Sequence, residues 1–449
     1  MAVFKAYDVR GTYPDQVNES LFEAIGEAAP LVLKCKSAVV GRDMRESGEA
    51  LSQAMIRGLV KAGVDVIDIG MASTPMVYFA TAFFKAGAGV QITASHNPAA
   101  YNGCKWCREE AIPVAYDSGL AEMEKLAARK VFTTADKPGA VSSADVSSEY
   151  RANLLKYAAG IKPLTIVVDA GNGVMGNFLP KLFEKLPCEL IPMYFEPDGS
   201  FPNHEANPIK PENMRDLMAK VKESGADLGV AYDGDGDRSM YVDERGEIIP
   251  ADFITALLAK EALARDPGAV VFYDLRSSKI CKEEIERLGG KAKMCRVGHS
   301  YIKAMMREEK AIFAGELSGH FYFRDLGYTD NAEMAMLSVL TALSKSGEKL
   351  SDLIRPFRKY FATGEINFVV EDTAAVLARL EEKYQASARE VHHLDGLSLY
   401  FDSYWMNIRA SNTEPVLRLN LEADSAARRD QALAEIEKAI GGKKEGGGH

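Results

Sequence analysis

Residues 164–174, LTIVVDAGNGV, decide how this 449-residue chain folds. The apolar, β-branched run is typical of a strand buried between two layers of helices, and it ends in a glycine-rich turn. A helix-like segment follows, then a strand at 189–194, and a third strand at 228–232 ends in a polar turn. Because strands that alternate with helices favour parallel pairing, this segment predicts an α/β unit with a largely parallel sheet.

The same plan occurs twice more along the chain. One copy begins at SAVVGRDMR (37–45) and closes at VQITASHNP (90–98), and another begins at AVVFYDLRSS (269–278) and closes at AIFAGELSGH (311–320). Each closing strand ends in a polar turn, and α/β sheets bind ligands outside the carboxyl ends of their strands. We therefore expect three similar α/β domains with mixed, largely parallel sheets around a central cleft.

The last part of the chain follows a different pattern. Short alternating runs such as EINFVV and VLRLNLEA, with helices expected at 373–384 and 425–440, predict a smaller α+β domain with an antiparallel sheet. Proline and glycine residues within 355–364 mark the linker before it. The expected domains are residues 1–147, 148–248, 249–360 and 361–449.

Composition and charge exclude several classes of protein. The net charge is −10 and no basic stripe is present, which argues against nucleic acid. The chain has no run of about 18 apolar residues, so no membrane span is expected. The charged N-terminus lacks the apolar core of a signal peptide. Six cysteines suit a reducing compartment, and Cys104 and Cys107 lack the further ligands of a zinc site. We expect a cytoplasmic protein with a small-molecule partner, either a monomer or a dimer.

Three aspartates alternate with glycines in the turn DGDGDR (233–238). The glycines let Asp233, Asp235 and Asp237 converge, and their mutual repulsion favours a cation among them. Oxygen ligands of this kind prefer Mg²⁺, Ca²⁺ or Mn²⁺ to zinc. An EF-hand is disfavoured, because Arg238 stands where that loop needs glycine and the flanks are predicted strands. A solvated acidic turn is the other alternative.

The turn TASHNP (93–98) places Ser95 next to His96. One interpretation is a hydrolase nucleophile with its base, but the GxSxG spacing is missing, and adjacent side chains on extended backbone point apart. A triad with His299 or His320 remains open, since triads are assembled in space. An ordinary polar turn and a serine that carries a group are the further alternatives.

Two other turns suit a cleft that binds anions. GELSGH (315–320) places a carboxylate and a hydroxyl between glycines, which suits the binding of sugar hydroxyls. RASNTEP (409–415) offers a guanidinium, two hydroxyls and an amide, and arginine binds phosphate oxygens in a bidentate manner. Either turn alone is also compatible with an ordinary loop or a helix cap.

Together, TASHNP, DGDGDR, GELSGH and RASNTEP resemble the four signature loops of the α-D-phosphohexomutases, in that family's order. FKAYDVRG (4–11) adds a fifth match, and the resemblance spans nearly the whole chain. The most similar subgroup is phosphomannomutase/phosphoglucomutase. The resemblance implies four domains around a central cleft and reversible conversion of hexose 1-phosphate to hexose 6-phosphate. It also implies Mg²⁺ as cofactor and a hexose 1,6-bisphosphate as intermediate and activator.

The resemblance further implies roles for individual residues. Ser95 would carry the phosphoryl group, and an oxygen of that group would bind Mg²⁺ together with Asp233, Asp235 and Asp237. 

Arg10 and Lys105 match positions near the phosphoserine, where one of them would assist proton transfer. An unperturbed lysine or arginine is a poor base, so this role needs a strongly shifted pKa. Arg238 would balance the charge of the phosphate, and His96 would belong to the supporting turn. The substrate-binding positions implied by the resemblance are Tyr7, Arg276, His299, Glu316, Ser318, His320, Arg409, Ser411, Asn412 and Thr413.

Residues of the third loop and of the segment after it bear on sugar preference. Leu317 stands where methionine is common in the phosphomannomutase/phosphoglucomutase pattern and glutamine in phosphoglucosamine mutases, which favours mannose and glucose phosphates. Residues 329–332, TDNA, lack the Asp-Gly pair that is common in relatives. A phosphoglucosamine mutase therefore remains an alternative. A metal-dependent phosphatase or serine hydrolase does not explain the phosphate-binding turn, and a non-catalytic sugar-phosphate sensor would lack residues of the metal or serine loop.

Overall fold

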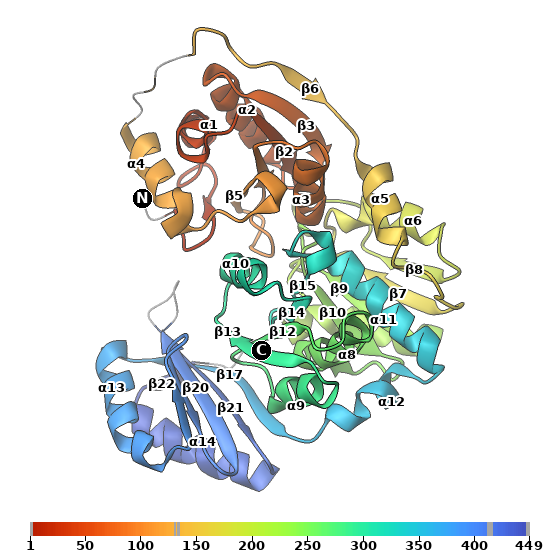
Figure 1. Ribbon diagram of the computed structural model, residues 1–449, viewed down its shortest axis with the longest axis vertical. Helices are drawn as coiled ribbons and strands as arrows, with labels where there is room; N and C mark the ends of the chain where they lie inside the picture. Colours follow the sequence, from red (N-terminus) through yellow and green to blue (C-terminus); the bar gives the residue numbers. More distant parts are fainter. Residues whose placement is uncertain (1–2, 130–131, 133–134, 411–415, 446–449) are drawn as a thin grey trace.

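The computed structural model describes residues 3–129, 132, 135–410 and 416–445. Three α/β domains follow one another along the chain, and a C-terminal domain with an antiparallel sheet completes the fold (Figure 1). The predicted fold class is therefore confirmed. Within the described ranges, no helix has both the length and the apolar character needed to cross a lipid bilayer.

The first domain is built on a six-stranded mixed sheet. Its strands are β1 (Val9–Thr12), β2 (Ser37–Arg42), β3 (Asp65–Met71), β4 (Ala88–Ile92), β5 (Tyr101–Arg108) and β6 (Val141–Ser143). Its helices are α1 (Glu19–Leu33), α2 (Gly48–Lys61), α3 (Thr74–Phe83) and α4 (Ala121–Arg129). Strands β4, β2, β3 and β6 pair in parallel, whereas β5 returns antiparallel to β4 and pairs with β1 at the sheet edge. The Ser95 turn connects β4 to this returning strand.

The second domain repeats the plan with five strands. They are β7 (Thr165–Asp169), β8 (Glu189–Met193), β9 (Leu228–Tyr232), β10 (Ser239–Asp243) and β11 (Ile248–Ile249), and the helices are α5 (Ser147–Leu155), α6 (Met175–Phe183) and α7 (Arg215–Ser224). The pairs β8–β7 and β7–β9 are parallel, and β10 returns antiparallel to β9. The aspartate turn lies between β9 and β10, the position of the Ser95 turn in the first domain.

The third domain follows the same order. Its strands are β12 (Val270–Asp274), β13 (Lys291–Cys295), β14 (Phe313–Gly315), β15 (Phe321–Phe323) and β16 (Thr329–Asp330). Its helices are α8 (Ala251–Arg265), α9 (Lys279–Arg287), α10 (His299–Glu309), α11 (Ala332–Ser346) and α12 (Leu350–Ile354). Strand β12 pairs in parallel with β13 and β14, and β15 returns antiparallel to β14. The Glu316 turn between β14 and β15 is thus the third equivalent turn.

The C-terminal domain has a six-stranded antiparallel sheet. Its strands are β17 (Phe361–Val369), β18 (Glu390–His392), β19 (Leu397–Tyr400), β20 (Tyr404–Ala410), β21 (Val416–Ala423) and β22 (Lys443–Glu445), and its helices are α13 (Thr373–Tyr384) and α14 (Ala426–Ile440). The second helix begins one residue later than expected because Ser425 is its N-cap, whose side chain accepts from the Arg428 N–H.

Apolar packing joins the first three domains and leaves the fourth separate. One buried cluster extends from α3 through the second sheet to α8 and α11, with Val77, Val167 and Leu257 among its members. The first domain has a further cluster beneath α1 and α2. The C-terminal sheet packs with α13 and α14 in a cluster of its own.

Candidate active site

The Ser95 turn is buried where the first and second domains meet. Ser95 has a φ of +53°, in the left-handed region, and its Oγ donates to Asp233 Oδ2 at 2.8 Å. The same Oγ lies 3.1 Å from His96 Nδ1. The expectation that Ser95 and His96 point apart is therefore wrong, because the backbone at Ser95 is left-handed rather than extended.

His96 remains a neutral ring in this setting. Burial lowers its pKa well below the usual value, and the positive charges of Arg238 and Arg10 lower it further. Among the described residues, no carboxylate hydrogen-bonds to the ring, and neither His299 nor His320 contacts Ser95 Oγ. A serine-hydrolase triad is thus not assembled around Ser95.

Asp233, Asp235 and Asp237 converge as their spacing predicts. All three are buried, and one carboxylate oxygen of each lies within 4.8 Å of the others. In the described part of the chain, Asp235 Oδ1 has no hydrogen-bond partner, whereas Asp237 Oδ1 lies 3.4 Å from His320 Nε2 and 3.9 Å from Arg238 Nε. Burial, followed by the neighbouring carboxylates, raises the pKa of Asp233. Three buried carboxylates crowded into one turn, with one oxygen that has no partner, fit a hard divalent cation.

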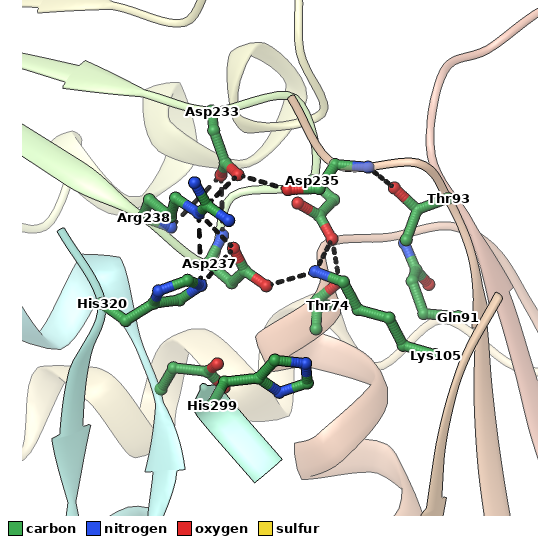
Figure 2. A network of polar contacts seen from close by, with 12 residues as sticks. Thr74, Gln91, Thr93, Lys105, Asp233, Asp235, Asp237, Arg238, His299 and His320 are labelled. Atoms are coloured by element: carbon green, nitrogen blue, oxygen red, sulfur yellow. Dashed lines mark hydrogen bonds and ion pairs between the residues drawn. The ribbon is translucent and has the colours of Figure 1, made fainter. Parts of the chain in front are cut away.

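The metal turn and the serine turn pack directly on each other. A Cβ at Gly234 would lie 2.7 Å from the Ser95 carbonyl oxygen, so only glycine fits there. Lys105, on β5, reaches the same place, and its Nζ donates to Asp235 Oδ2 at 2.7 Å and to Asp237 Oδ2 at 2.5 Å (Figure 2). Burial opposes the charge of Lys105, but the two carboxylates outweigh it and raise its pKa. Lys105 is therefore protonated here.

Arg10 lies on the cavity side of the serine turn. It donates to Asn97 Oδ1 and to Asp8 Oδ2, both at 2.6 Å. Burial opposes its charge, but Asp8 and other acidic neighbours raise its pKa. The pKa values of Arg10 and Lys105 are thus raised, whereas a lysine or arginine that acts as general base needs a lowered pKa.

Arg238 joins the metal turn to the third domain. Its Nε lies 3.6 Å from Asp233 Oδ2 and donates to His320 Nε2 at 3.3 Å (Figure 2). His320 Nδ1 lies 2.9 Å from Ser318 Oγ and 3.2 Å from Glu316 Oε2. Three predicted site residues of the Glu316 turn thus share one network with the aspartates.

Glu316 is held in position by its own domain. Tyr322 OH donates to Glu316 Oε2 at 2.8 Å, and the Gly298 N–H donates to Glu316 Oε1 at 3.3 Å. Arg276, after β12, lies 3.6 Å from Glu316 Oε1. His299 begins α10 and packs edge-on against Tyr7 of the first domain, with ring centres 4.8 Å apart.

The unusual TDNA segment has a structural explanation. Asn331 is the N-cap of α11, and its Oδ1 accepts from the Met334 N–H at 2.7 Å. Its Nδ2 donates to Tyr150 OH of the second domain at 2.7 Å. Asn331 is therefore a helix cap that also joins the second and third domains.

Arg409 lies on β20 of the C-terminal domain and donates to Glu365 Oε2 at 2.9 Å. Arg418 and Arg276 approach the same carboxylate, at 3.5 Å and 3.9 Å. Burial opposes the charge of Glu365, but the arginines lower its pKa, beginning with Arg276. The predicted phosphate-binding residues Ser411, Asn412 and Thr413 lie outside the described residues.

A cavity of about 1040 Å³ connects these groups. Its lining includes Tyr7, Arg10 and His96 of the first domain, Arg238 of the second, Arg276 and Ser318 of the third, and Glu365 and Arg418 of the fourth. Cations and hydroxyls thus face one space from all four domains, an arrangement suited to a phosphorylated, hydroxyl-rich ligand.

Comparison with known protein families identifies one family that matches all four domains. Models of the phosphoglucomutase/phosphomannomutase family match residues 1–132 (α/β/α domain I), 148–246 (α/β/α domain II), 250–360 (α/β/α domain III) and 365–439 (C-terminal domain). The chain belongs to this family. The resemblance drawn from five loops is confirmed, and the chain is a phosphohexomutase, an isomerase that moves a phosphoryl group within its substrate.

Relatives of this phosphohexomutase cover its whole length. A protein of Xanthomonas campestris named "Phosphohexose mutases" is 42% identical over 97% of each chain. A phosphomannomutase of Salmonella montevideo is 40% identical over 94% of this chain and 95% of its own. A crystal structure of a phosphoglucomutase/phosphomannomutase family protein from Burkholderia thailandensis has 34% identity, a TM-score of 0.91 and 99% coverage of both chains.

Sequence reasoning missed several residues of the phosphohexomutase site. Glu365 and Arg418 face the cavity from strands that showed only alternation, and Thr74 donates to Asp235 Oδ2 at 2.5 Å. Arg45 lies beneath the Ser95 turn. Arg45 and Thr74 carried a usable signal, because each follows a strand that ends at the same sheet edge as the strand before Ser95.

Proposed function

We propose that this phosphohexomutase interconverts the 1-phosphates and 6-phosphates of mannose or glucose through a phosphoserine at Ser95 and a bound hexose 1,6-bisphosphate. The observation that carries the proposal is the contact of Ser95 Oγ with Asp233 Oδ2 at 2.8 Å, beside a cavity with arginines on its far wall. The names of the phosphomannomutase relatives support mannose phosphate as a substrate.

Asp233, Asp235 and Asp237, with an oxygen of the Ser95 phosphate, are the residues that would hold Mg²⁺. Asp235 and Asp237 each accept from Lys105 through Oδ2, so a cation at their Oδ1 atoms would not compete with the lysine for the same oxygens. Asp237 Oδ1 also lies 3.4 Å from His320 Nε2. The bound ion supplies positive charge that neutralises the transferring phosphoryl group.

Phosphoryl transfer then requires a sugar hydroxyl aligned with the phosphorus and a group that receives the proton of this hydroxyl. A sugar hydroxyl attacks the phosphorus, the bond from phosphorus to Ser95 Oγ breaks, and the hydroxyl proton is returned to Ser95 Oγ. Arg10, Lys105 and Arg238 neutralise charge on the phosphoryl oxygens, because the first two are held in their protonated forms. His96, a neutral ring 3.1 Å from Ser95 Oγ, can hydrogen-bond to the serine hydroxyl that this transfer leaves behind.

The opposite wall binds the other end of the substrate. Glu316 and Ser318, supported by His320, His299 and Tyr7, bind sugar hydroxyls. Arg276 and Arg409, with Ser411, Asn412 and Thr413, bind the distal phosphate. Glu365 orients these arginines before the substrate arrives, since its carboxylate lies among them.

The domain limits at 147/148, 248/249 and 360/361 and a cytoplasmic location are part of this proposal. All six cysteines are free thiols, which suits a reducing compartment. The proposed partner is a phosphosugar, without nucleic acid or membrane.

Two measurements test the proposal together. Coupled assays with mannose 1-phosphate, glucose 1-phosphate and glucosamine 1-phosphate, each with catalytic hexose 1,6-bisphosphate, should show turnover of the first two. Intact-protein mass spectrometry after treatment with the bisphosphate should show one added phosphate that Ser95→Ala lacks. No turnover of any sugar, or the same phosphate on Ser95→Ala, would contradict the proposal.

A further inference from the structure

Arg45 lies buried beneath the serine turn and holds most of its backbone. Its guanidinium donates to the carbonyl oxygens of Ser95 at 2.9 Å and Asn97 at 2.6 Å through one nitrogen. The second nitrogen donates to the carbonyl oxygens of Pro98 and Tyr101, both at 2.8 Å. One side chain thus binds four carbonyls, that of Ser95 and three that follow it in the chain.

A second connection reaches the amide of the same residue. Asp43 Oδ2 accepts from Arg45 Nε at 3.2 Å and from Thr93 Oγ1 at 2.6 Å. Thr93 Oγ1 in turn accepts from the Ser95 N–H at 2.8 Å. Both peptide groups that flank the Ser95 side chain are therefore fixed by one buried network of Arg45, Asp43 and Thr93.

This network holds the backbone of Ser95 in an unusual conformation. Ser95 is a non-glycine residue in the left-handed region, a conformation that persists only where surrounding contacts determine it. The planar fork of arginine offers five N–H donors in fixed directions, and a lysine ammonium cannot match four carbonyls at these positions. Without the fork, the turn is free to relax and to carry Ser95 Oγ away from Asp233.

The second domain closes the other side of the guanidinium. The Phe201 ring lies over it, with the guanidinium carbon 5.2 Å from the ring centre. Gly199 approaches so closely that a Cβ there would lie 2.7 Å from Arg45 Cα. The domain that carries the metal turn therefore also keeps the arginine under the serine turn.

We propose that Arg45 is a positioning residue for the phosphoryl-carrying serine, which keeps the Ser95 turn in one conformation so that Oγ stays against the metal-binding aspartates. The inference rests on the proposed function, because it concerns the transfer step at Ser95. Arg45 acts through the backbone of the turn, and its side chain is not among those that line the cavity.

The test compares Arg45→Lys with the parent protein and with Met55→Ala. Met55 is buried on α2 of the same domain, outside the site, and serves as a control for lost stability alone. We expect Arg45→Lys to lower kcat on the order of 100-fold, as a displaced reacting group does, with KM for the hexose 1-phosphate changed less than about threefold. Its Ser95 should also take up phosphate from hexose 1,6-bisphosphate more slowly. Met55→Ala, assayed well below its Tm, should keep the parent kcat.

The outcomes separate the two proposals. A parent protein without phosphate on Ser95 would overturn the proposed function itself. A phosphorylated, active parent together with an Arg45→Lys variant within about threefold of its kcat would overturn only the positioning role. An equal loss of kcat in Met55→Ala would also overturn the positioning role, because lost stability alone would then explain the effect. If Arg45→Lys does not fold, Thr93→Val decides: a fall in kcat of about tenfold supports the role, and an unchanged kcat overturns it.

Discussion

The two walls of the cleft are built in different ways. On one wall, the serine turn and the metal turn come from two domains whose apolar residues form one continuous cluster, and Gly234 packs against the Ser95 carbonyl. On the other wall, Arg409 and Arg418 belong to a domain with its own separate core. The reacting groups are thus fixed by packing, whereas the groups that bind the distal phosphate sit on a separately packed domain.

Polar contacts join the C-terminal domain to the third domain. Glu422 Oε1 accepts from the Lys279 N–H at the start of α9 at 3.0 Å, and Arg276 Nη1 lies 3.9 Å from Glu365 Oε2. Beside these contacts lies a mainly apolar cavity of about 280 Å³, lined by residues of the second, third and fourth domains. A separate core and unfilled space at the junction permit rotation of the domain, as lids and closing domains require.

The largest expected effect concerns the fixed wall. Asp235→Asn removes one carboxylate of the metal turn, and turnover should fall about 100- to 1000-fold, the usual loss when a group that stabilises transition-state charge is removed. The rise in Tm that Mg²⁺ produces in the parent protein should disappear as well, because the ion stabilises only the state that binds it. Coupled assays and thermal unfolding with and without Mg²⁺ measure both effects, and a retained Mg²⁺ shift would contradict the proposed metal site.

A change on the opposite wall should leave the metal response intact. Arg409→Met removes a guanidinium proposed to bind the distal phosphate, and kcat/KM should fall by about 10- to 100-fold through loss of a charged hydrogen bond. The Mg²⁺-dependent shift in Tm should equal that of the parent protein. The same two experiments therefore distinguish the walls, and loss of the Mg²⁺ shift in this variant would show that they are not independent.

A third prediction concerns the core that the first three domains share. Burial raises the pKa of Glu333, on α11, from 4.5 to about 8. The folded state therefore keeps a proton that the unfolded state releases, and this stabilising contribution is lost as the pH rises from the unfolded value towards 8. Relative to Glu333→Gln, the unfolding free energy of the parent should fall by about 2 kcal/mol between pH 6 and pH 8.

Denaturant unfolding at several pH values checks this prediction. The change should be confined to the transition of the first three domains, because the C-terminal core does not include Glu333. A parallel pH dependence in parent and variant would show that Glu333 is ionised in the folded protein.

The smallest expected effect is a change of shape. Binding of hexose 1,6-bisphosphate should bring the C-terminal domain towards the first domain and lower the radius of gyration, because the ligand contacts both walls. Small-angle scattering with and without the bisphosphate measures this change. An identical scattering curve would mean that the cleft is already closed in the free protein.

Much of the fold and of the site could be predicted from the sequence. The rhythm of strands and helices predicted three equivalent α/β units, because buried parallel strands need continuous apolar runs and leave a clear pattern. The loops with Ser95, Asp233 and Glu316 were found because glycines and polar residues concentrate chemistry in short segments. The one error in geometry, the relative direction of Ser95 and His96, came from assuming extended backbone where the turn is left-handed.

The amino-acid sequence by itself determined the domain plan, the family and the loops that carry the chemistry, since each of these depends on residues close together along the chain. Only the tertiary structure decided which distant groups meet: Lys105 with the aspartates, three arginines around Glu365, and Arg45 beneath the serine turn. Such contacts depend on how strands and domains pack against one another, and residues separated by 44 to 132 positions leave no local pattern by which they could be paired.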